Sequence, residues 1–432
     1  METVDPDKAA PLSVSSTILV AGEPRKEQLF ECPEGGVQAW LTVAGGTLIQ
    51  FCSFGYVNAF GVYQYFYVSK YLSHYSPSDI GWIGGAQVFL TFFMGVLTGN
   101  AFDRGYFRHL LVASTLLHAL ALYTLSVTQE NQYCQIFLAQ GICLGLSHGL
   151  TYTPSFAIVS HYFQRRKTLA IGLVSSGASL GAIIHPILLN RLINGPIGFH
   201  NAVRISASLN VSLLIIANIL CKTRLPPRTS MSRLQVIEFF KDPPYICLII
   251  CIFLTFCGLF FPFFYLQIDA VNHNVNPTLA FYVFSILNTA NWVGRAIPTA
   301  FATVIGVYNA FTACTVAMGI VLLCMAAVKD ASGIVLVAIF YGFFAGATVS
   351  LAPAVLGGLA RNVDEIGARI GIAFGICAIM ALFAQPISGA LLTGKLLWLH
   401  AILFAGLAEL VSAVFGIVAC RFVVLRKGSW KV

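Results

Sequence analysis

The feature that most limits how this chain can fold is a series of long apolar runs. A helix needs about 20 apolar residues to cross the hydrocarbon core of a bilayer, and a scan at that length finds twelve candidate spans. They lie at 38–66, 80–101, 107–127, 132–158, 168–190, 201–221, 244–268, 278–301, 305–328, 332–357, 367–393 and 399–424. A backbone inside lipid must satisfy its own hydrogen bonds, and a helix does so within one segment. The sequence therefore predicts an all-α polytopic membrane protein with 12 transmembrane helices.

Composition leads to the same conclusion. Of the 432 residues, 57% are hydrophobic and 10% are charged, whereas soluble domains average about 25% charged residues. A soluble fold of this length could not bury so much apolar surface. The formal net charge of +8 does not indicate a nucleic-acid partner, because membrane proteins collect Lys and Arg on their cytoplasmic side. We expect a lipid bilayer around the chain and no nucleic acid bound to it.

The distribution of Lys and Arg predicts the orientation. If both ends are cytoplasmic, nineteen basic residues lie in inside segments, five lie outside, and Arg295 falls within a span. This bias follows the positive-inside rule, so we expect a multi-pass protein of the plasma membrane with both termini in the cytoplasm. The first 37 residues are polar and acid-rich, without the basic start and apolar core of a signal peptide, and we expect a disordered cytosolic tail.

The chain is predicted to be a duplication. A polar segment with two Pro-Pro pairs, 222–243, separates six spans from six. Pro154 and Pro353, and likewise Pro186 and Pro386, recur at offsets of 199 and 200 residues, and such repeats are typical of transporters with two related halves. The expected organisation is a disordered cytosolic N-tail (1–37), an N-terminal six-helix bundle (38–221), a cytosolic connector (222–243), a C-terminal six-helix bundle (244–424) and a cytosolic C-tail (425–432).

The loop between the second and third spans carries a motif. In "GNAFDRGYFRHLL", Gly99 precedes Asp103, Arg104 and Arg108. This resembles the Gly-x-x-x-Asp-Arg-x-Gly-Arg signature of the major facilitator superfamily, with the second glycine one position early. The resemblance implies two pseudo-symmetric bundles that rock to give alternating access. Gly99 would permit a close helix approach, Asp103 would face a helix N-terminus across the interface between the halves, and the arginines would stay in water.

Two further stretches are similar to the monocarboxylate-type porters of that superfamily. "YFQRRKTLAIGLVSSG" (162–177) resembles their span 5 signature, and "EGGVQAW" (34–40) resembles the acid-Gly-Gly…Trp signature before span 1. The arrangement from residue 34 onward resembles fungal members, many of which are assigned to efflux of secondary metabolites. We interpret Arg165 and Arg166 as an inside anchor of span 5. Small-residue rows containing Gly172 and Gly177 would let helices approach and slide at the interface between the halves.

One departure from that family bears on mechanism. Proton-coupled monocarboxylate porters carry an Asp four residues before an Arg in span 8, and "NTANWVGRAIP" supplies Asn291 and Arg295 at those positions. Their functional Lys in span 1 aligns with Val62. The chain keeps the Arg but lacks the proton-carrying acid and the second cation. Proton-monocarboxylate symport by the family's usual residues is therefore not expected.

Polar residues within the spans are the candidate site residues. Arg295 is the only cation deep in a span, where a charge costs at least about 2.5–3.5 kcal/mol; we expect it to contact an anionic or carbonyl-rich substrate, the alternative being a pairing with backbone carbonyls or snorkelling. Glu409 is the only acid deep in a span, and it is either a proton carrier or, favoured by the peripheral place of span 12 in the superfamily, a structural residue. The remaining substrate-binding candidates, each of which could instead make interhelical hydrogen bonds, are Asn58, His148, Tyr152, Tyr265, Asn288, Asn291 and Gln385.

Nothing in the sequence indicates catalysis. It contains no G-x-S-x-G, H-E-x-x-H or GxxxxGK[ST] motif, and Cys247 and Cys251 have no His or carboxylate close in sequence, so we expect no enzyme activity, cofactor or metal. The predicted function is proton-driven export of a small organic anion or secondary metabolite by a monomeric secondary transporter. The alternatives are proton-coupled uptake of a monocarboxylate or related solute, and a non-transporting nutrient sensor.

Overall fold

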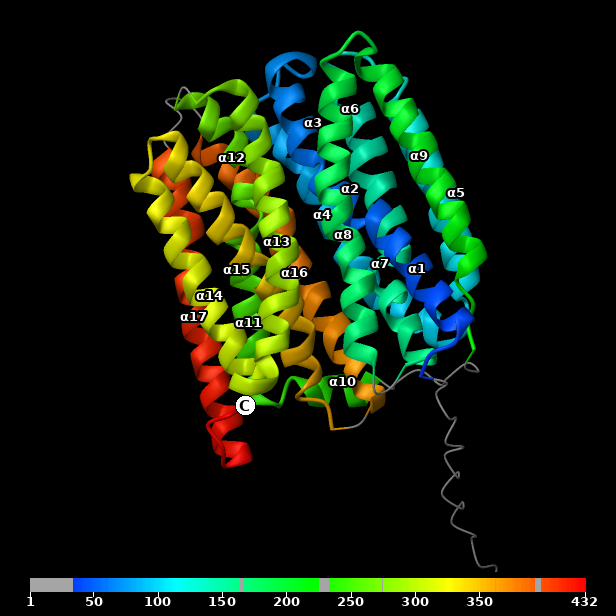
Figure 1. Ribbon diagram of the computed structural model, residues 1–432, viewed down its shortest axis with the longest axis vertical. Coiled ribbons are helices and arrows are strands. Elements are labelled where there is room, and N and C mark those ends of the chain that lie inside the picture. Colours follow the sequence, from blue (N-terminus) through cyan, green and yellow to red (C-terminus); the bar gives the residue numbers. More distant parts are fainter. Residues whose placement is uncertain (1–33, 164–165, 225–232, 274, 362, 393–397) are drawn as a thin grey trace, which may run out of the picture. The chain divides into compact units, whose positions relative to one another are not determined.

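The computed structural model describes residues 34–163, 166–224, 233–273, 275–361, 363–392 and 398–432, and every regular element within them is a helix (Figure 1). Ten of the described helical segments are long and apolar enough to cross a membrane. They correspond to ten of the spans expected from the sequence. The all-α membrane architecture is therefore confirmed.

The helices fall into two groups along the chain. The first group comprises α1 (Val37–Cys52), α2 (Phe54–Asn58), α3 (Phe60–Phe66), α4 (Pro77–Asp103), α5 (Phe107–Leu125), α6 (Tyr133–Ile136), α7 (Leu144–Ala157), α8 (Lys167–Ile193) and α9 (Gly198–Leu220). After α10 (Arg233–Phe239), the second group comprises α11 (Pro243–Leu259), α12 (Phe261–Asn272), α13 (Pro277–Ile305), α14 (Val307–Cys324), α15 (Ala331–Gly357), α16 (Val363–Leu391) and α17 (Trp398–Lys427).

The two remaining expected spans are helical, but they are not among the ten. The first, 38–66, is divided into α1, α2 and α3. The hydroxyl of Ser53 donates to the Ile49 carbonyl (2.7 Å) and the amide of Asn58 to the Phe54 carbonyl (2.7 Å), and such bonds to the preceding turn bend a helix. The second, 278–301, is the continuous helix α13, whose Asn and Arg side chains lower its hydropathy.

The same helix pairs recur in both groups. In the first group α4 packs on α7, α1 on α9 and α5 on α9. In the second group α13 packs on α15, α11 on α17 and α14 on α17. This correspondence is the packing that a duplicated bundle would give.

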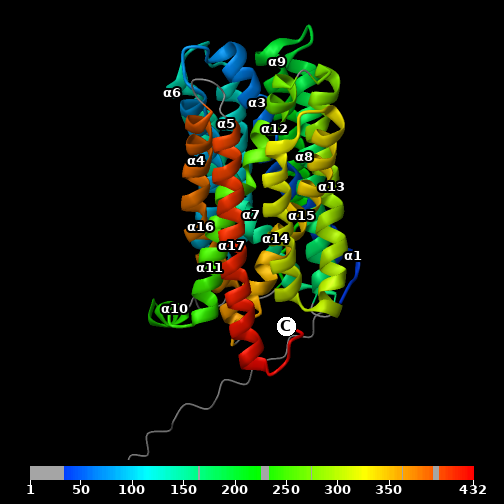
Figure 2. The same ribbon diagram turned by 90° about the vertical axis from the view of Figure 1, so that its left-hand side faces the viewer.

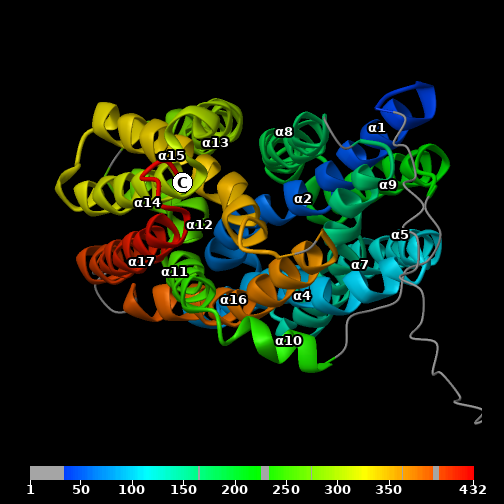
Figure 3. The same ribbon diagram turned by 90° about the horizontal axis from the view of Figure 1, so that it is seen from below.

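The groups meet mainly along two pairs of helices, which can be followed in Figure 3: α4 with α16, and α8 with α13. A third contact joins α3 to α12. The α4–α16 contact is a close backbone approach, because a Cβ on Gly85 would lie 2.5 Å from the Leu382 carbonyl oxygen. Ser78 Oγ also donates to the Pro386 carbonyl at 2.9 Å. These contacts join the groups near the starting end of α4, called here the α3 end; the opposite end is the α10 end.

A buried ion network holds the α10 end of the second group together. Arg369 of α16 is only 2% exposed, and its guanidinium donates to Asp242 Oδ2 (3.1 Å) and Glu365 Oε2 (3.3 Å). It also lies 4.6 Å from the ring centroid of Phe239 on α10. Arg426 of α17 donates to the other oxygen of Asp242 at 2.7 Å. Figure 2 shows α10 and the last turns of α17 at the same end of the bundle.

We predict that Arg369→Ala destabilises the protein while an exposed neighbour does not. Removing one partner of a buried pair leaves uncompensated charge and costs about 3 kcal/mol or more. The control is Arg361→Ala, because Arg361 is exposed and such changes alter stability by about 0.5 kcal/mol or less. Thermal unfolding of the purified variants in detergent measures both, and equal midpoints would contradict the role given to the network.

Candidate functional site

One cation lies at the boundary between the two groups of helices. Arg295 is half-buried on α13, where its Nε donates to Asn291 Oδ1 one turn earlier (3.1 Å). Its Nη1 donates to Ser175 Oγ of α8 at 2.7 Å. Since α8 belongs to the first group, this hydrogen bond joins the groups. Tyr152 of α7 also lies close enough to Arg295 for an electrostatic interaction.

An aromatic layer also crosses the boundary. The ring of Phe92 on α4 lies 5.1 Å from Tyr152 in its own group, 5.2 Å from Phe256 on α11 and 5.8 Å from Phe374 on α16, between centroids. These separations are typical of favourable aromatic pairs. Through Tyr152, the aromatic layer adjoins the cation. The combination suits a ligand that has one anionic or carbonyl-rich end and one apolar part.

The other predicted polar residues use their side chains locally. Asn58 and Asn288 are buried, and each amide donates to a carbonyl four residues earlier in the chain, at 2.7 and 3.0 Å. Tyr265 Oη donates to the backbone carbonyl of Gln385 at 3.4 Å, and both residues are buried. Asn58 and Asn288 thus bond within their own helices, whereas Tyr265 makes the interhelical bond of the alternative, from α12 to α16. Their substrate-binding role stays a prediction. Asn291 is the predicted asparagine that contacts Arg295.

His148 does not lie where the sequence predicted. It is 1% exposed and faces α5, with its ring 5.3 Å from that of His118 and 6.4 Å from that of Tyr56. The reason is that this face of α7 packs on α5 within the first group. His148 therefore lies inside one group rather than in the site around Arg295.

Glu409 lies inside the second group. It is fully buried on α17, beside Thr255 of α11. A Cβ added to Gly319 of α14 would lie 3.2 Å from the Cβ of Glu409. These neighbours all belong to one group. Glu409 therefore does not lie at the boundary, and both of its carboxylate oxygens lack a hydrogen-bond partner among the described residues. The proton-carrier role and the structural role both stay predictions.

The two motifs that resemble the porter signatures contact each other. The Glu34 amide donates to the Tyr162 carbonyl (3.1 Å), and the Arg166 amide donates to Glu34 Oε2 (3.2 Å). Trp40 packs edge-on against Phe163 with centroids 5.2 Å apart. The segment before α1 is thus fixed to the start of α8, which the sequence reading did not anticipate. Arg165 lies outside the described residues, and Arg166 is exposed.

The predicted gating residues are charged residues at the α4–α5 turn and α8, and glycines on α4 and α8. Asp103, Arg104 and Arg108 are exposed around the α4–α5 turn. Added Cβ atoms on Gly99 and Gly172 would meet nothing within 4 Å, so the close approach expected at these two glycines is absent.

Gly177 does support a close approach, but within one group. An added Cβ there would collide with the carbonyl oxygen of Thr47 on α1. The expected sliding contact between the halves at Gly177 is therefore wrong for this conformation. The residues of α8 that bond to the other group include Ser175, which the sequence indicated only as a small residue, and Arg191, whose Nη2 donates to Tyr282 Oη of α13 at 3.1 Å.

We predict that Gly177→Val disrupts folding and Gly172→Val does not. Both glycines lie on α8, so the two substitutions restrict the backbone equally. Only the valine at position 177 would overlap the α1 backbone, and this overlap lowers the free energy of unfolding by about 1–3 kcal/mol or more. The yield of monodisperse protein and its thermal midpoint measure the difference. Equal behaviour of the two variants would contradict the α1–α8 packing.

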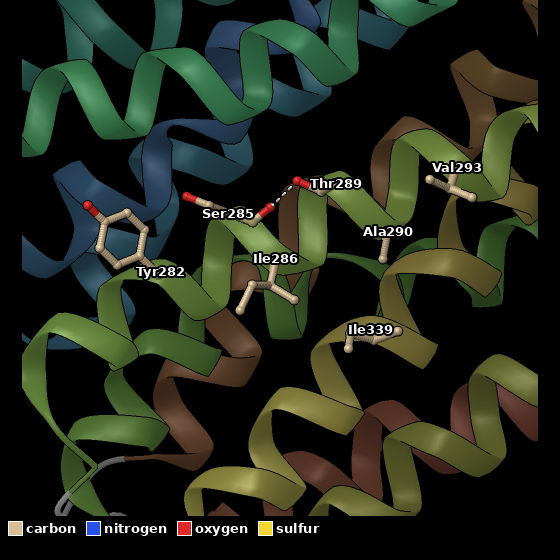
Figure 4. Close-up of a pocket in the computed structure, with 7 residues that line it drawn as sticks. All are labelled: Tyr282, Ser285, Ile286, Thr289, Ala290, Val293 and Ile339. Atoms are coloured by element: carbon tan, nitrogen blue, oxygen red, sulfur yellow. Dashed lines mark hydrogen bonds between the residues drawn. The ribbon is translucent and has the colours of Figure 1, made fainter.

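A separate apolar groove of about 350 Å³ runs along α13. Figure 4 shows its lining residues, which are Tyr282, Ser285, Ile286, Thr289, Ala290, Val293 and, from α15, Ile339. It contains neither Arg295 nor Asn291, and Ile339 is 39% exposed. The groove is thus distinct from the site around Arg295 and Asn291. Within the described part of the chain, no cluster of three or more His, Cys, Asp or Glu residues could hold a metal ion.

Comparisons with known proteins agree with this architecture. Residues 46–303 match the family model of the Major Facilitator Superfamily. The aspyridones efflux protein apdF of Emericella nidulans is 35% identical over 369 residues, covering 85% of this chain and 75% of that protein. The agnestins efflux protein AgnL12 of Paecilomyces divaricatus is 34% identical over 423 residues, covering 96% and 93%. The crystal structure of the nucleoside transporter NupG superposes with a TM-score of 0.67 at 15% identity, covering 88% of this chain and 99% of that one; this likeness concerns the fold alone.

Proposed function

This chain belongs to the major facilitator superfamily, and we propose that it exports a small amphipathic organic anion of the kind made as a fungal secondary metabolite. As a member of that superfamily it is a multi-pass membrane transporter and not an enzyme. Its relatives named as efflux proteins are similar over most of their length. The observation that carries the proposed ligand class is the Arg295–Ser175 contact between the two groups.

Arg295 gives this contact a chemistry that a substrate can use. Its guanidinium presents a planar fork of donors that fits a carboxylate or enolate. One of those donors now binds the neutral hydroxyl of Ser175. A carboxylate adds to the hydroxyl's single hydrogen bond a second, parallel one and the attraction of opposite charges, so an anion would replace Ser175 as the partner of Arg295. Substrate binding would then release α13 from α8, as alternating access requires.

The aromatic layer accounts for the rest of the ligand. Phe92, Phe256 and Phe374 come from both groups and lie next to Tyr152. Aromatic and apolar lining with few polar groups is typical of sites for drug-sized molecules. An anion with an aromatic or aliphatic body would therefore contact both groups at once.

We assign the protein to the monocarboxylate porter-like branch, with efflux rather than uptake. The contact between Glu34 and Arg166 supports the branch, since it gives the two signature stretches a common structural purpose. Asn291 supports efflux, because it occupies the place of the proton-carrying acid and holds Arg295 instead. Proton-coupled monocarboxylate uptake is the alternative, and nothing in the site favours a non-transporting sensor.

We further propose that the α10 end faces the cytoplasm at the plasma membrane, with the protein acting as a monomer. Arg104, Arg108 and Arg166 are exposed at this end, in agreement with the positive-inside rule. Both the N-tail (1–37) and the connector (222–243) would then be cytosolic. The helix pairs repeated in the two groups support the proposed division into bundles 38–221 and 244–424.

Deleting the gene is predicted to raise the intracellular level of one class of organic anion and to lower its level in the medium. Comparison of both compartments by mass spectrometry between the deletion strain, the wild type and a complemented strain measures this. A compound that instead falls inside the cell and rises outside would establish uptake and contradict export.

Arg295 variants are predicted to lose transport of that compound without loss of folding. Losing a hydrogen bond to a charged group costs about 1.5–3 kcal/mol, which corresponds to about a tenfold to hundredfold loss of transport rate for Arg295→Gln. Arg295→Lys should recover part of it, because the charge remains while the fork is lost. Export from cells, normalised to protein at the membrane, is the measurement.

The matched control for this series is Arg204→Gln. Arg204 also donates to a serine, Ser126, at 3.3 Å, but both residues belong to the first group. We expect this control to transport at the wild-type rate. Unchanged export by Arg295→Gln would contradict the substrate role of Arg295.

A further inference from the structure

Three histidines from three helices surround one tyrosine inside the first group. Ring centroids of His118 (α5), His148 (α7) and His185 (α8) lie 6.0, 6.4 and 5.0 Å from that of Tyr56 on α2. The rings of His118 and His148 are 5.3 Å apart. All four side chains are at most 1% exposed. We call these four residues the histidine cluster.

The cluster is short of hydrogen-bond partners. Both ring nitrogens of His148, Nε2 of His118 and Nδ1 of His185 have none among the described residues. A neutral imidazole needs one acceptor for its N–H and one donor for its lone pair. Leaving such a group buried and unpaired costs about 1–3 kcal/mol. An ordinary packing role does not explain why three imidazoles meet here at that cost.

A pair of phenols extends the cluster toward the α3 end. Tyr56 Oη lies 2.7 Å from Tyr63 Oη, and Ser206 Oγ of α9 donates to Tyr56 Oη at 3.4 Å. His185 Nε2 lies 3.3 Å from the carbonyl oxygen of Phe51. The unpartnered ring nitrogens do not bond to these hydroxyls, so a proton moves between them only through water that enters the cluster.

The surroundings of the cluster contain no carboxylate from the spans. Within residues 38–221 the acids are Asp79, Asp103 and Glu130. Asp79 lies in the first turn of α4, Asp103 is the last residue of α4, and Glu130 lies in the α5–α6 loop. The basic residues of these elements that the structure describes lie at helix ends or close to them: Lys70, Arg104, Arg108, Arg166, Lys167, Arg191 and Arg204. The buried thiols and phenols within the spans of the packed elements are Cys52, Cys221, Tyr63 and Tyr67. The remaining ones are half-buried (Tyr65, Tyr133, Cys143 and Tyr152) or exposed (Tyr123 and Cys134). Since the described residues offer no metal site, a proton is the ligand that fits.

We propose that the histidine cluster is a proton-binding site within the first group, and that it couples the export proposed above to the proton gradient. The proposal rests on that export function. A proton from water on the open side binds the lone pair of a ring nitrogen, and it leaves to water on the other side. Histidine is the side chain that ordinarily changes charge between pH 5 and 8.

Proton binding is linked to conformation because the cluster is buried and has few hydrogen-bond partners. An imidazolium has two N–H donors and a positive charge, which a buried site without partners destabilises. Protonation therefore favours a conformation in which water or an anion reaches the cluster, and loss of the proton favours the conformation described here, in which the four side chains are buried. Such differential stabilisation shifts a two-state equilibrium. Glu409, buried in the second group, is the competing proton site.

The test uses protons alone and needs no identified substrate. Purified full-length wild type and the double variant His118→Gln/His148→Gln are titrated in unbuffered detergent solution from about pH 8 to 5. We expect the double variant to bind about one proton per chain fewer than wild type. A parallel titration of free imidazole in the same detergent solution calibrates the method, because imidazole takes up about one proton in this range.

Two titration results overturn the proposal. In the first, the double variant superposes on wild type while free imidazole shows its proton uptake. In the second, Glu409→Gln loses the proton and the histidine variant keeps it. Neither result bears on export, which the metabolite comparison tests separately, so the two failures are distinguishable.

A second measurement on the wild type does not depend on the folding of a variant. Diethyl pyrocarbonate reacts with neutral imidazoles that water reaches, and mass spectrometry reads each histidine. We expect His118 and His148 to react more slowly than His74, with a yield that falls as pH decreases from about 8 to 5. No reaction at His118 and His148 at any pH, or a yield independent of pH, overturns the proposal.

Discussion

The hydrogen bond from Arg295 to Ser175 is the interaction on which the functional account depends. A guanidinium within a span is costly in lipid, so its position has to be one where protein or substrate satisfies it. Here Asn291 holds it from one side and Ser175 from the other group of helices. This contact differs in kind from the α4–α16 contact, where backbones touch at Gly85 and Leu382. A backbone contact depends on shape, whereas a hydroxyl partner can be exchanged for an anion.

The polar side chains of the described residues make different kinds of contact in different parts of the structure. Arg369 and Asp242 form a buried ion pair, to which the exposed Arg426 adds a second partner for Asp242, and these contacts join helices of one group. Glu34 joins the segment before α1 to the start of α8. Arg295 alone of the arginines deep in the spans contacts the other group. Because these sets are separate, a change at the site can alter transport without removing the contacts that hold each group together.

The sequence predicted the helices well because their cause is local and strong. Segments of about 20 apolar residues have one solution in a bilayer, and the bounds of α4, α5, α9, α14 and α15 lie within a few residues of those expected. Arg295 and Asn291 stay predicted site residues; the sequence pointed to them because an ionisable residue in a span must be placed beside partners. The helix breaks at Ser53 and Ala59 were missed, since they depend on where single side chains bond.

Residue orientation was the part that the sequence could not supply. His148 was expected at the boundary, but which face of α7 meets α5 is decided by packing over the whole group. The glycines show the same limit, because Gly172 and Gly177 look alike in sequence, and only Gly177 has a neighbouring backbone. Arg369 was counted with the inside charges, and its burial depends on Asp242, 127 residues away in the chain.

The most direct test of the account is the distance between α8 and α13 when the exported anion binds. Spin labels at the exposed positions Leu173 and Ile297 report it, with Cys32, Cys134 and Cys324 replaced by serine. Adding the compound that accumulates in the deletion strain is expected to lengthen this distance in the wild type and to leave it unchanged in Arg295→Gln. A wild-type distance that does not respond to the anion would contradict the exchange of Ser175 for substrate.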